Sequence, residues 1–222
     1  MQKGIKFRIY PNREQQNLIN QTLGCCRLIY NKGLAMRNEA YENGNKIGYS
    51  QTSAMLTELK RCEDFAFLKV VDSIALQQSL RDLDKGFVNF FQKRAAHPVF
   101  KSKHNRHQAY RTINQGDNIR IVGRYIKLPK LGLVKIRQSM EVGKINNVTI
   151  EHTPTDKYFA VLNVEFEPQP RPNNGGFIGI DVGIKEFYSD SNGNVVPTPK
   201  YLEKSMRKLI REQRKLSRKQ KN

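Results

Sequence analysis

The spacing of apolar residues changes part-way along the chain, and this change constrains the fold more than any other feature. Residues 11–95 repeat apolar side chains every three to four positions, whereas residues 118–167 alternate apolar and polar side chains. The first period is typical of helices with one buried face, and the second is typical of half-buried strands. The sequence therefore predicts an α+β chain in which a helical segment precedes a β-rich segment.

A strand is also predicted at the N-terminus, where Ile5–Tyr10 alternates apolar and basic residues before Pro11. Asn12 and Gln15 then stand in the spacing of a capping box, so a helix should begin after Asn12. If the N-terminal strand pairs with the later strands, residues 11–95 form a helical insertion in a β-domain. The first two helices of this insertion could resemble a helix-turn-helix.

Two further helices are predicted over 50–61 and 72–94. In the second, Phe87, Phe90 and Phe91 admit two interpretations, a platform on which bases stack or a stripe of core residues. The helical spacing favours the core stripe. Five strands should follow and form a small barrel or a strongly curled sheet. They are Asn118–Val122, Tyr125–Leu128, Leu131–Arg137, Ile145–Glu151 and Tyr158–Glu167.

Positive charge is concentrated in two stretches of a chain whose formal net charge is +19. Residues 98–137 have a surplus of +9 and residues 200–222 a surplus of +8, which indicates a polyanionic partner such as nucleic acid. Residues 97–111 lack a period, and we interpret them as a phosphate-contacting loop with Phe100 or Tyr110 available for stacking; a mobile basic loop is the alternative. The predicted nucleic-acid contacts are Lys6, Arg8, Arg27, Lys101, Lys103, Arg106, Arg111, Arg120, Lys130, Arg207, Arg211 and Arg214.

Other partners are not indicated. The three cysteines contain no Cys-x-x-Cys pair, so we expect neither a disulfide framework nor a zinc site within this chain. No apolar run reaches the ~18–20 residues of a membrane-spanning helix, and the N-terminus lacks the apolar core of a signal peptide. We therefore expect a cytoplasmic, nucleoid-associated protein without a membrane or small-molecule cofactor.

One acidic residue, Asp181, lies within the apolar stretch Phe177–Phe187, which should form a buried strand and a hairpin. A buried carboxylate needs a compensating donor or cation, and Mg²⁺ accepts oxygen ligands of this kind. A solvent-facing Asp at the end of a strand explains the pattern equally well. Residues 167–176, rich in Pro and Gly, should separate this segment from the preceding domain.

Seven motifs, in this order, resemble the TnpB (OrfB) family of transposon-associated proteins, which are related to type V CRISPR effectors. The motifs are Lys6–Pro11, Gly24–Arg27 with Tyr30-Asn31, Ala75–Asp84, Pro98–Lys103, Leu128–Gly132, Gly179–Lys185 and Leu216–Lys221. The resemblance implies a wedge-type β-barrel (1–10 and 96–168) with an inserted helical recognition domain (11–95). A linker (169–176) and the start of a RuvC-type nuclease domain with the RNase H-like fold (177–222) would follow.

Family members bind a guide RNA and cleave matching DNA with Mg²⁺, and Asp181 falls on their first catalytic, metal-binding carboxylate. The family's site needs three carboxylates, however, and only Glu186, Asp190, Glu203 and Glu212 follow Asp181. We therefore expect an N-terminal fragment that binds nucleic acid and does not cleave alone. Alternatives are a non-catalytic DNA- or RNA-binding regulator and a nuclease completed by a second chain. An actin-like ATPase fragment would need small hydroxyl residues where Ile184-Lys185-Glu186 stands.

Overall fold

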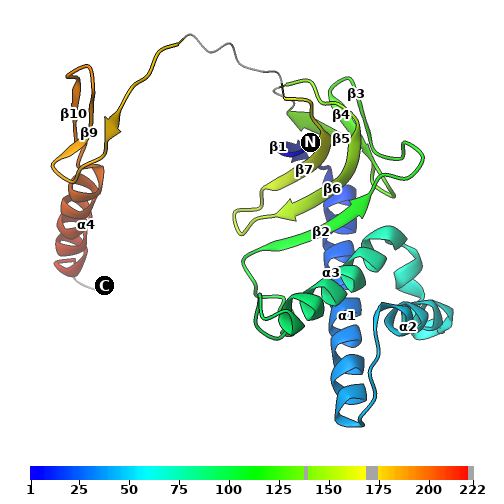
Figure 1. Cartoon of the computed structure of the whole chain (residues 1–222). Coiled ribbons are helices and arrows are strands. Elements are labelled where there is room, and N and C mark those ends of the chain that lie inside the picture. The colour runs from blue at the N-terminus through cyan, green and yellow to red at the C-terminus, as the bar shows by residue number, and fades with distance from the viewer. Residues whose placement is uncertain (138–139, 169–174, 220–222) are drawn as a thin grey trace. The chain divides into compact units, whose positions relative to one another are not determined.

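The computed structural model describes residues 1–137, 140–168 and 175–219, and the chain divides into two compact units, Met1–Pro168 and Gln169–Asn222 (Figure 1). The helices of the first unit are α1 (Arg13–Glu42), α2 (Tyr49–Arg61), the 3₁₀ helix η1 (Glu63–Lys69) and α3 (Ser73–Phe91). Its strands are β1 (Gln2–Tyr10), β2 (Gln108–Ile113), β3 (Arg120–Val122), β4 (Tyr125–Leu128), β5 (Gly132–Arg137), β6 (Ile145–His152) and β7 (Tyr158–Glu165).

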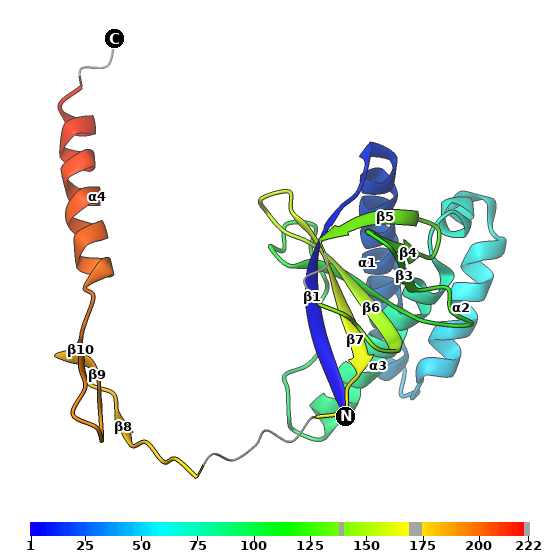
Figure 2. The same ribbon diagram turned by 90° about the horizontal axis from the view of Figure 1, so that it is seen from above.

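The N-terminal strand pairs with the later strands, as predicted, and it lies at the centre of the sheet. The seven strands are ordered β2-β6-β7-β1-β5-β4-β3, and every neighbouring pair is antiparallel. Along β1, Ile9 stands opposite Tyr158 of β7 on one side and Ile136 of β5 on the other. Figure 2 shows the resulting sheet curving around one end of the helices. The fold is therefore α+β with a curled antiparallel sheet.

A side chain links the two ends of the curled sheet where the described residues form no ladder between β2 and β3. The Asn114 amide, just after β2, donates to the carbonyls of Ile119 at 3.0 Å and Ile145 at 2.9 Å. Its oxygen accepts from the Ile119 amide at 2.9 Å. Asn114 thus provides backbone-like hydrogen bonds at the point where the strands separate.

Helix α1 begins with the predicted capping box, which is confirmed. The Asn12 side chain accepts from the Gln15 amide at 2.8 Å, and the Gln15 side chain accepts from the Asn12 amide at 3.0 Å. Gln15 also donates to the carbonyls of Leu131 and Leu133 at 3.0 and 2.9 Å. The cap therefore fixes the start of α1 against the turn between β4 and β5.

The core is formed where the inner face of the sheet meets α1 and α3, which Figure 1 shows running away from it. Phe7 and Ile9 of β1 are buried in one cluster with the stripe of α1 that the sequence predicted to be buried. Helices α1 and α3 approach closely at Gly33, where an added Cβ would lie 2.9 Å from Leu80 Cδ2. Glycine is thus favoured here by the close approach of Leu80 and not by its backbone angles.

Two sequence predictions in the first unit were wrong. The segment preceding β3 is not loop throughout, because Gln108–Ile113 forms β2 and extends the sheet beside β6. Tyr110 is buried within this strand, at 6% exposure, and cannot stack on a base. The alternation of Tyr110 and Thr112 was obscured by the cations around it. The 3₁₀ helix over Glu63–Lys69 was not predicted either.

The second unit consists of β8 (Ile180–Asp181), β9 (Glu186–Asp190), β10 (Val195–Pro197) and α4 (Tyr201–Ser217), with its strands ordered β10-β9-β8. The prediction that the Phe177–Phe187 stretch is buried was wrong for the chain as it stands. Phe177 is 92% exposed and Ile184 97% exposed, since within this unit no second layer covers the described part of the hairpin. In the part of the chain that the structure describes, no helix has the length and apolar character needed to cross a membrane.

Candidate nucleic-acid interface

Four of the predicted contact residues surround one hollow between α1 and the loop that precedes β2. Arg27, Lys103 and Arg106 line a cavity of about 550 Å³, together with His104. Lys101 lines an adjoining cavity of about 310 Å³, which shares Arg27 with the first. We call these two cavities the basic hollow. Four cations from two segments far apart in the sequence thus face one concave surface.

Hydrogen bonds hold the loop of this hollow in place. The Asn31 side chain on α1 donates to the Lys101 carbonyl at 3.0 Å and accepts from the Lys101 amide at 2.8 Å. The Gln108 side chain donates to the Asn105 carbonyl at 2.7 Å, and the Ser102 hydroxyl accepts from the His104 amide at 3.1 Å. The loop is therefore a series of bonded turns anchored to a helix.

The electrostatics of the hollow favour an anion. Removal from water lowers the pKa of the Lys101 ammonium, although Asp82 and Cys26 nearby act to raise it. This ammonium lies 4.1 Å from the centre of the Tyr30 ring. Asp156, the only carboxylate among the described residues that line the larger cavity, is 3.1 Å from His152. Burial raises the pKa of the adjacent Cys26 thiol, so it is not a nucleophile here.

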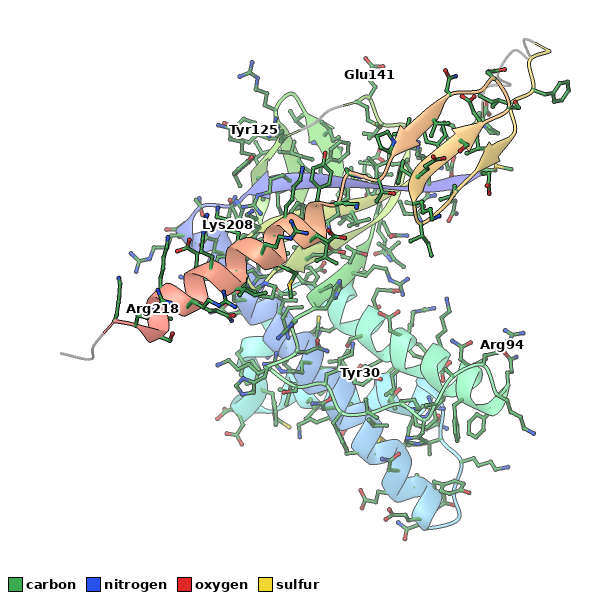
Figure 3. All side chains as sticks on the ribbon, turned by 90° about the vertical axis from the view of Figure 1, so that its left-hand side faces the viewer. Tyr30, Arg94, Tyr125, Glu141, Lys208 and Arg218 are labelled. Carbon is green, nitrogen blue, oxygen red and sulfur yellow. The ribbon has the colours of Figure 1, made fainter. Side chains whose placement is uncertain are left out.

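A second basic surface lies on the outer face of the sheet. Arg8 of β1 stands opposite Arg137 of β5, and Tyr10 stands opposite Lys135, which in turn stands opposite Tyr125 of β4. Tyr10 and Tyr125 are 46% and 45% exposed; Figure 3 labels the side chain of Tyr125. Cations and aromatic rings therefore alternate across neighbouring strands, an arrangement that suits phosphates and unpaired bases.

Aromatic rings orient the predicted cations of β1. The Arg8 guanidinium lies 5.1 Å from the Phe159 ring and 5.5 Å from the Tyr10 ring. The Lys6 ammonium lies 4.6 Å from the same Phe159 ring and pairs with Glu151 of β6. Cation–π contacts of this kind hold a charged group in place at a partly exposed site.

The remaining predicted contacts in the first unit are separate from the hollow. Arg111 of β2 pairs with Asp82 and donates to Gln78 at 3.4 Å, so it connects the sheet to α3. Arg120 belongs to the edge strand β3, and exposed Lys130 lies in the β4–β5 turn with a positive φ of 63°. The structure does not gather these three side chains into one site.

In the second unit, Arg207, Arg211 and Arg214 line a shallow groove along α4 with Lys215 and Arg218. Figure 3 shows Lys208 on this helix and Arg218 just past its C-terminal end. Among the described residues, Arg207 pairs with Glu203 at 3.6 Å and Arg211 with Glu212 at 3.4 Å, and such exposed pairs contribute little to stability. The helix thus presents unburied positive charge along its length.

Asp181 is exposed on the short strand β8, opposite Ser189 of β9. The two nearest acids of the hairpin are engaged elsewhere: Glu186 accepts from the Ser189 hydroxyl, and Asp190 accepts from the amides of Asn192 and Asn194. These hydrogen bonds lower the pKa of Asp190, the Asn194 side chain most of all. Among the described residues, no three His, Cys, Asp or Glu side chains group to hold a metal ion.

The sequence did not predict that the aromatic side chains of Tyr10 and Tyr125 lie in one row on the outer face of the sheet. Tyr125 and Lys135 belong to no recognisable sequence motif. Their place in the same row as Tyr10 follows from the register of the strands. The alternation of residues within each strand assigns a face to a side chain, but it does not pair one strand with another.

Two family models match the two ends of the chain. A family model described as "Helix-turn-helix domain", of the OrfB proteins of the IS605 group, matches residues 1–46. A second OrfB model of the same group, described as "Probable transposase", matches residues 151–222. In the structure the first of these stretches is strand β1 followed by the single helix α1. These matches define the class, probable transposases of the OrfB group.

Individual relatives identify the family within this class. A protein of Escherichia coli named "Putative RNA-guided DNA endonuclease InsQ" is 35% identical over 98% of this chain and 54% of its own length. A "Putative RNA-guided DNA endonuclease" of Streptomyces pristinaespiralis is 34% identical over 100% of this chain and 56% of its own. "Virulence protein VsdF" of Salmonella dublin is 34% identical over 48% of this chain and 98% of its own. The chain belongs to the TnpB (OrfB) family, as its motifs predicted, and spans about half the length of the two endonuclease relatives.

Proposed function

We propose that this chain binds guide RNA and target DNA as the nucleic-acid-binding part of an RNA-guided DNA endonuclease. The observation that carries the proposal is the basic hollow, where Arg27, Lys101, Lys103 and Arg106 converge from two segments of the chain. The names of the two endonuclease relatives support the choice of RNA and DNA as the polyanions. Phosphate contacts from such cations supply most of the affinity of a protein for nucleic acid.

The proposed domains follow the family layout. Residues 1–10 and 96–168 would be the wedge-type β-barrel, with residues 11–95 as the inserted helical recognition domain. The curled sheet with β1 at its centre supports this assignment, because it brings the two β segments together around the insertion. Residues 169–176 would be the linker, although residues 169–174 lie outside the described part of the chain, and residues 177–222 would be the start of the RuvC-type domain. We place the protein in the cytoplasm, on the nucleoid.

Asp181 is the proposed catalytic and metal-binding residue. The described residues around it do not fit a complete Mg²⁺ site, because Glu186 and Asp190 are occupied by hydrogen bonds within the hairpin. Asp181 would supply one ligand, and further carboxylates, waters or substrate phosphates would supply the others. We therefore propose binding, not cleavage, as the activity of residues 1–222 alone.

Binding of labelled guide-type RNA and of single- and double-stranded DNA by the purified chain tests the proposal. We expect binding that weakens steeply with salt, and equal affinity for the Asp181→Ala variant. With Mg²⁺ added, neither protein should cleave the DNA. Affinity that is indifferent to salt, or no affinity for any of these polymers, would contradict the proposed function.

A further inference from the structure

A third cavity, of about 530 Å³, lies where the C-terminal part of α1 meets the end of α3, and no predicted contact residue lines it. Aromatic rings dominate its lining: Tyr41 of α1, Phe87, Phe90 and Phe91 of α3, and His97. Its volume falls within the ~300–1,000 Å³ range of small-ligand sites.

The inner part of the cavity is a fixed aromatic cluster. The His97 ring stands edge-on to Phe87 and Phe90, with ring centres 5.3 and 5.1 Å apart. Phe91 lies 5.4 Å from Phe90 and 6.2 Å from Phe87. The interpretation of these phenylalanines as a core stripe is therefore right for Phe87, which is buried, and wrong for Phe91, which is 69% exposed.

Two exposed rings at the opening leave flat apolar faces available to a ligand. Phe91 is 69% exposed, and Tyr41 on the opposing helix is 74% exposed. Exposed aromatic side chains beside a concave surface are energetically costly in water and suit a flat, weakly hydrated partner. A nucleobase has this shape, and stacking on aromatic rings is how unpaired bases are commonly bound.

Polar groups in the lining suit the edges and the phosphate of a nucleotide. The Arg37 guanidinium lies 4.1 Å from the Phe87 ring centre and pairs with Asp84 at 2.8 Å, which fixes it in place. The amides of Asn38 and Asn45 line the same cavity and can donate to or accept from a base edge. Lys46 adds a positive charge, and no carboxylate belongs to the lining among the described residues.

We propose that this cavity, the aromatic pocket, binds one unpaired base of a bound RNA. The proposal rests on the proposed function, and it assigns a second kind of contact in addition to the phosphate contacts of the basic hollow. We choose RNA because its loops and bulges present bases that are already unpaired, whereas duplex DNA must first lose a base pair. A peptide occupant is less consistent with the amides and the lysine around an aromatic floor.

Phe91→Leu tests the pocket, because leucine keeps an apolar side chain and removes the aromatic face. We expect binding of a short single-stranded RNA to weaken roughly tenfold, and Phe91→Tyr to restore it. Phe67→Leu is the matched control, since Phe67 is a 46% exposed phenylalanine of η1 outside the pocket. A short RNA that carries 5-iodouridine should, on irradiation, cross-link to Tyr41, Phe91 or His97.

The results of these experiments distinguish failure of the aromatic pocket from failure of the proposed function on which it rests. If RNA binding is salt-sensitive and neither Phe91→Leu nor Phe67→Leu weakens it, the proposed role of the aromatic pocket is wrong. The proposed function would remain intact. Cross-links confined to the 101–108 loop or the sheet would lead to the same conclusion. An equal loss of affinity for single-stranded DNA in Phe91→Leu would overturn the assignment to RNA. Loss of all RNA binding in the unaltered chain would overturn both.

Discussion

Removing charge from the basic hollow should change how binding depends on salt more than it changes the fold. The variant replaces Arg27, Lys103 and Arg106 with alanine. Each of these side chains lines the hollow, and among the described residues the three make one side-chain hydrogen bond, a long one of 3.4 Å from Arg27 to Gln108. The free energy of unfolding of this variant should therefore be close to that of the unaltered chain.

The magnitude follows from counterion release. Each phosphate contact to a single strand contributes about 0.7 to the slope of log affinity against log salt, so three contacts contribute about 2. Between about 50 and 200 mM salt, the unaltered chain should therefore lose about 20-fold more affinity for single-stranded RNA than the variant loses.

Fluorescence anisotropy titrations over a series of salt concentrations measure this slope. The control variant replaces Arg61, Lys69 and Lys85 with alanine, which removes the same charge from exposed positions on α2, η1 and α3. Its slope should stay close to that of the unaltered chain. Equal slopes for the two triple variants would show that net charge, and not the hollow, directs binding, and the reasoning would fail.

Three further changes probe the scaffold of the hollow. Gly33→Ala should lower the free energy of unfolding by about 1–3 kcal/mol relative to Gly24→Ala in urea denaturation, because its Cβ meets Leu80 whereas the Cβ at Gly24 has nothing nearer than 4.0 Å; equal stabilities would contradict this. Asn31→Ala should cost about 1 kcal/mol and weaken RNA binding, since both hydrogen bonds to the Lys101 backbone are lost; unchanged affinity would show that the loop needs no anchor. Because desolvation lowers the pKa of Lys101 from 10.5, its charge is lost earlier as pH rises, so affinity should decline on the alkaline side, and Lys101→Arg should shift the decline to higher pH.

Local patterns in the sequence predicted the elements that depend on near neighbours. The Asn12–Gln15 cap, the buried stripe of α1 and most strands of the sheet follow from spacing alone. The strand β2 did not, because Tyr110 and Thr112 are the only clear inward positions in a short segment rich in cations. Phe91 also departed from its pattern, since it lies in the last turn of α3, where the helix extends past the residues that would cover it.

The candidate site was predictable in composition but not in geometry. The sequence identified Arg27 and Lys101 as separate cations, and only the fold shows that they border one hollow. Arg111 belongs to the same charge-rich segment yet pairs with Asp82, because β2 places it against α3. Which cations converge depends on contacts between distant segments, and net charge carries no information about them.

The central position of β1 has a consequence for biosynthesis. This strand is translated well before its partners β5 and β7, which end at Arg137 and Glu165. At the usual ~5–20 residues per second, the nascent strand waits on the order of 10–30 seconds before the second of these neighbours has been translated. Throughout that interval its hydrogen-bonding edges are open to any other extended chain. An N-terminal fusion or a chaperone that shields residues 2–10 during translation should therefore raise the yield of folded protein more than one placed elsewhere.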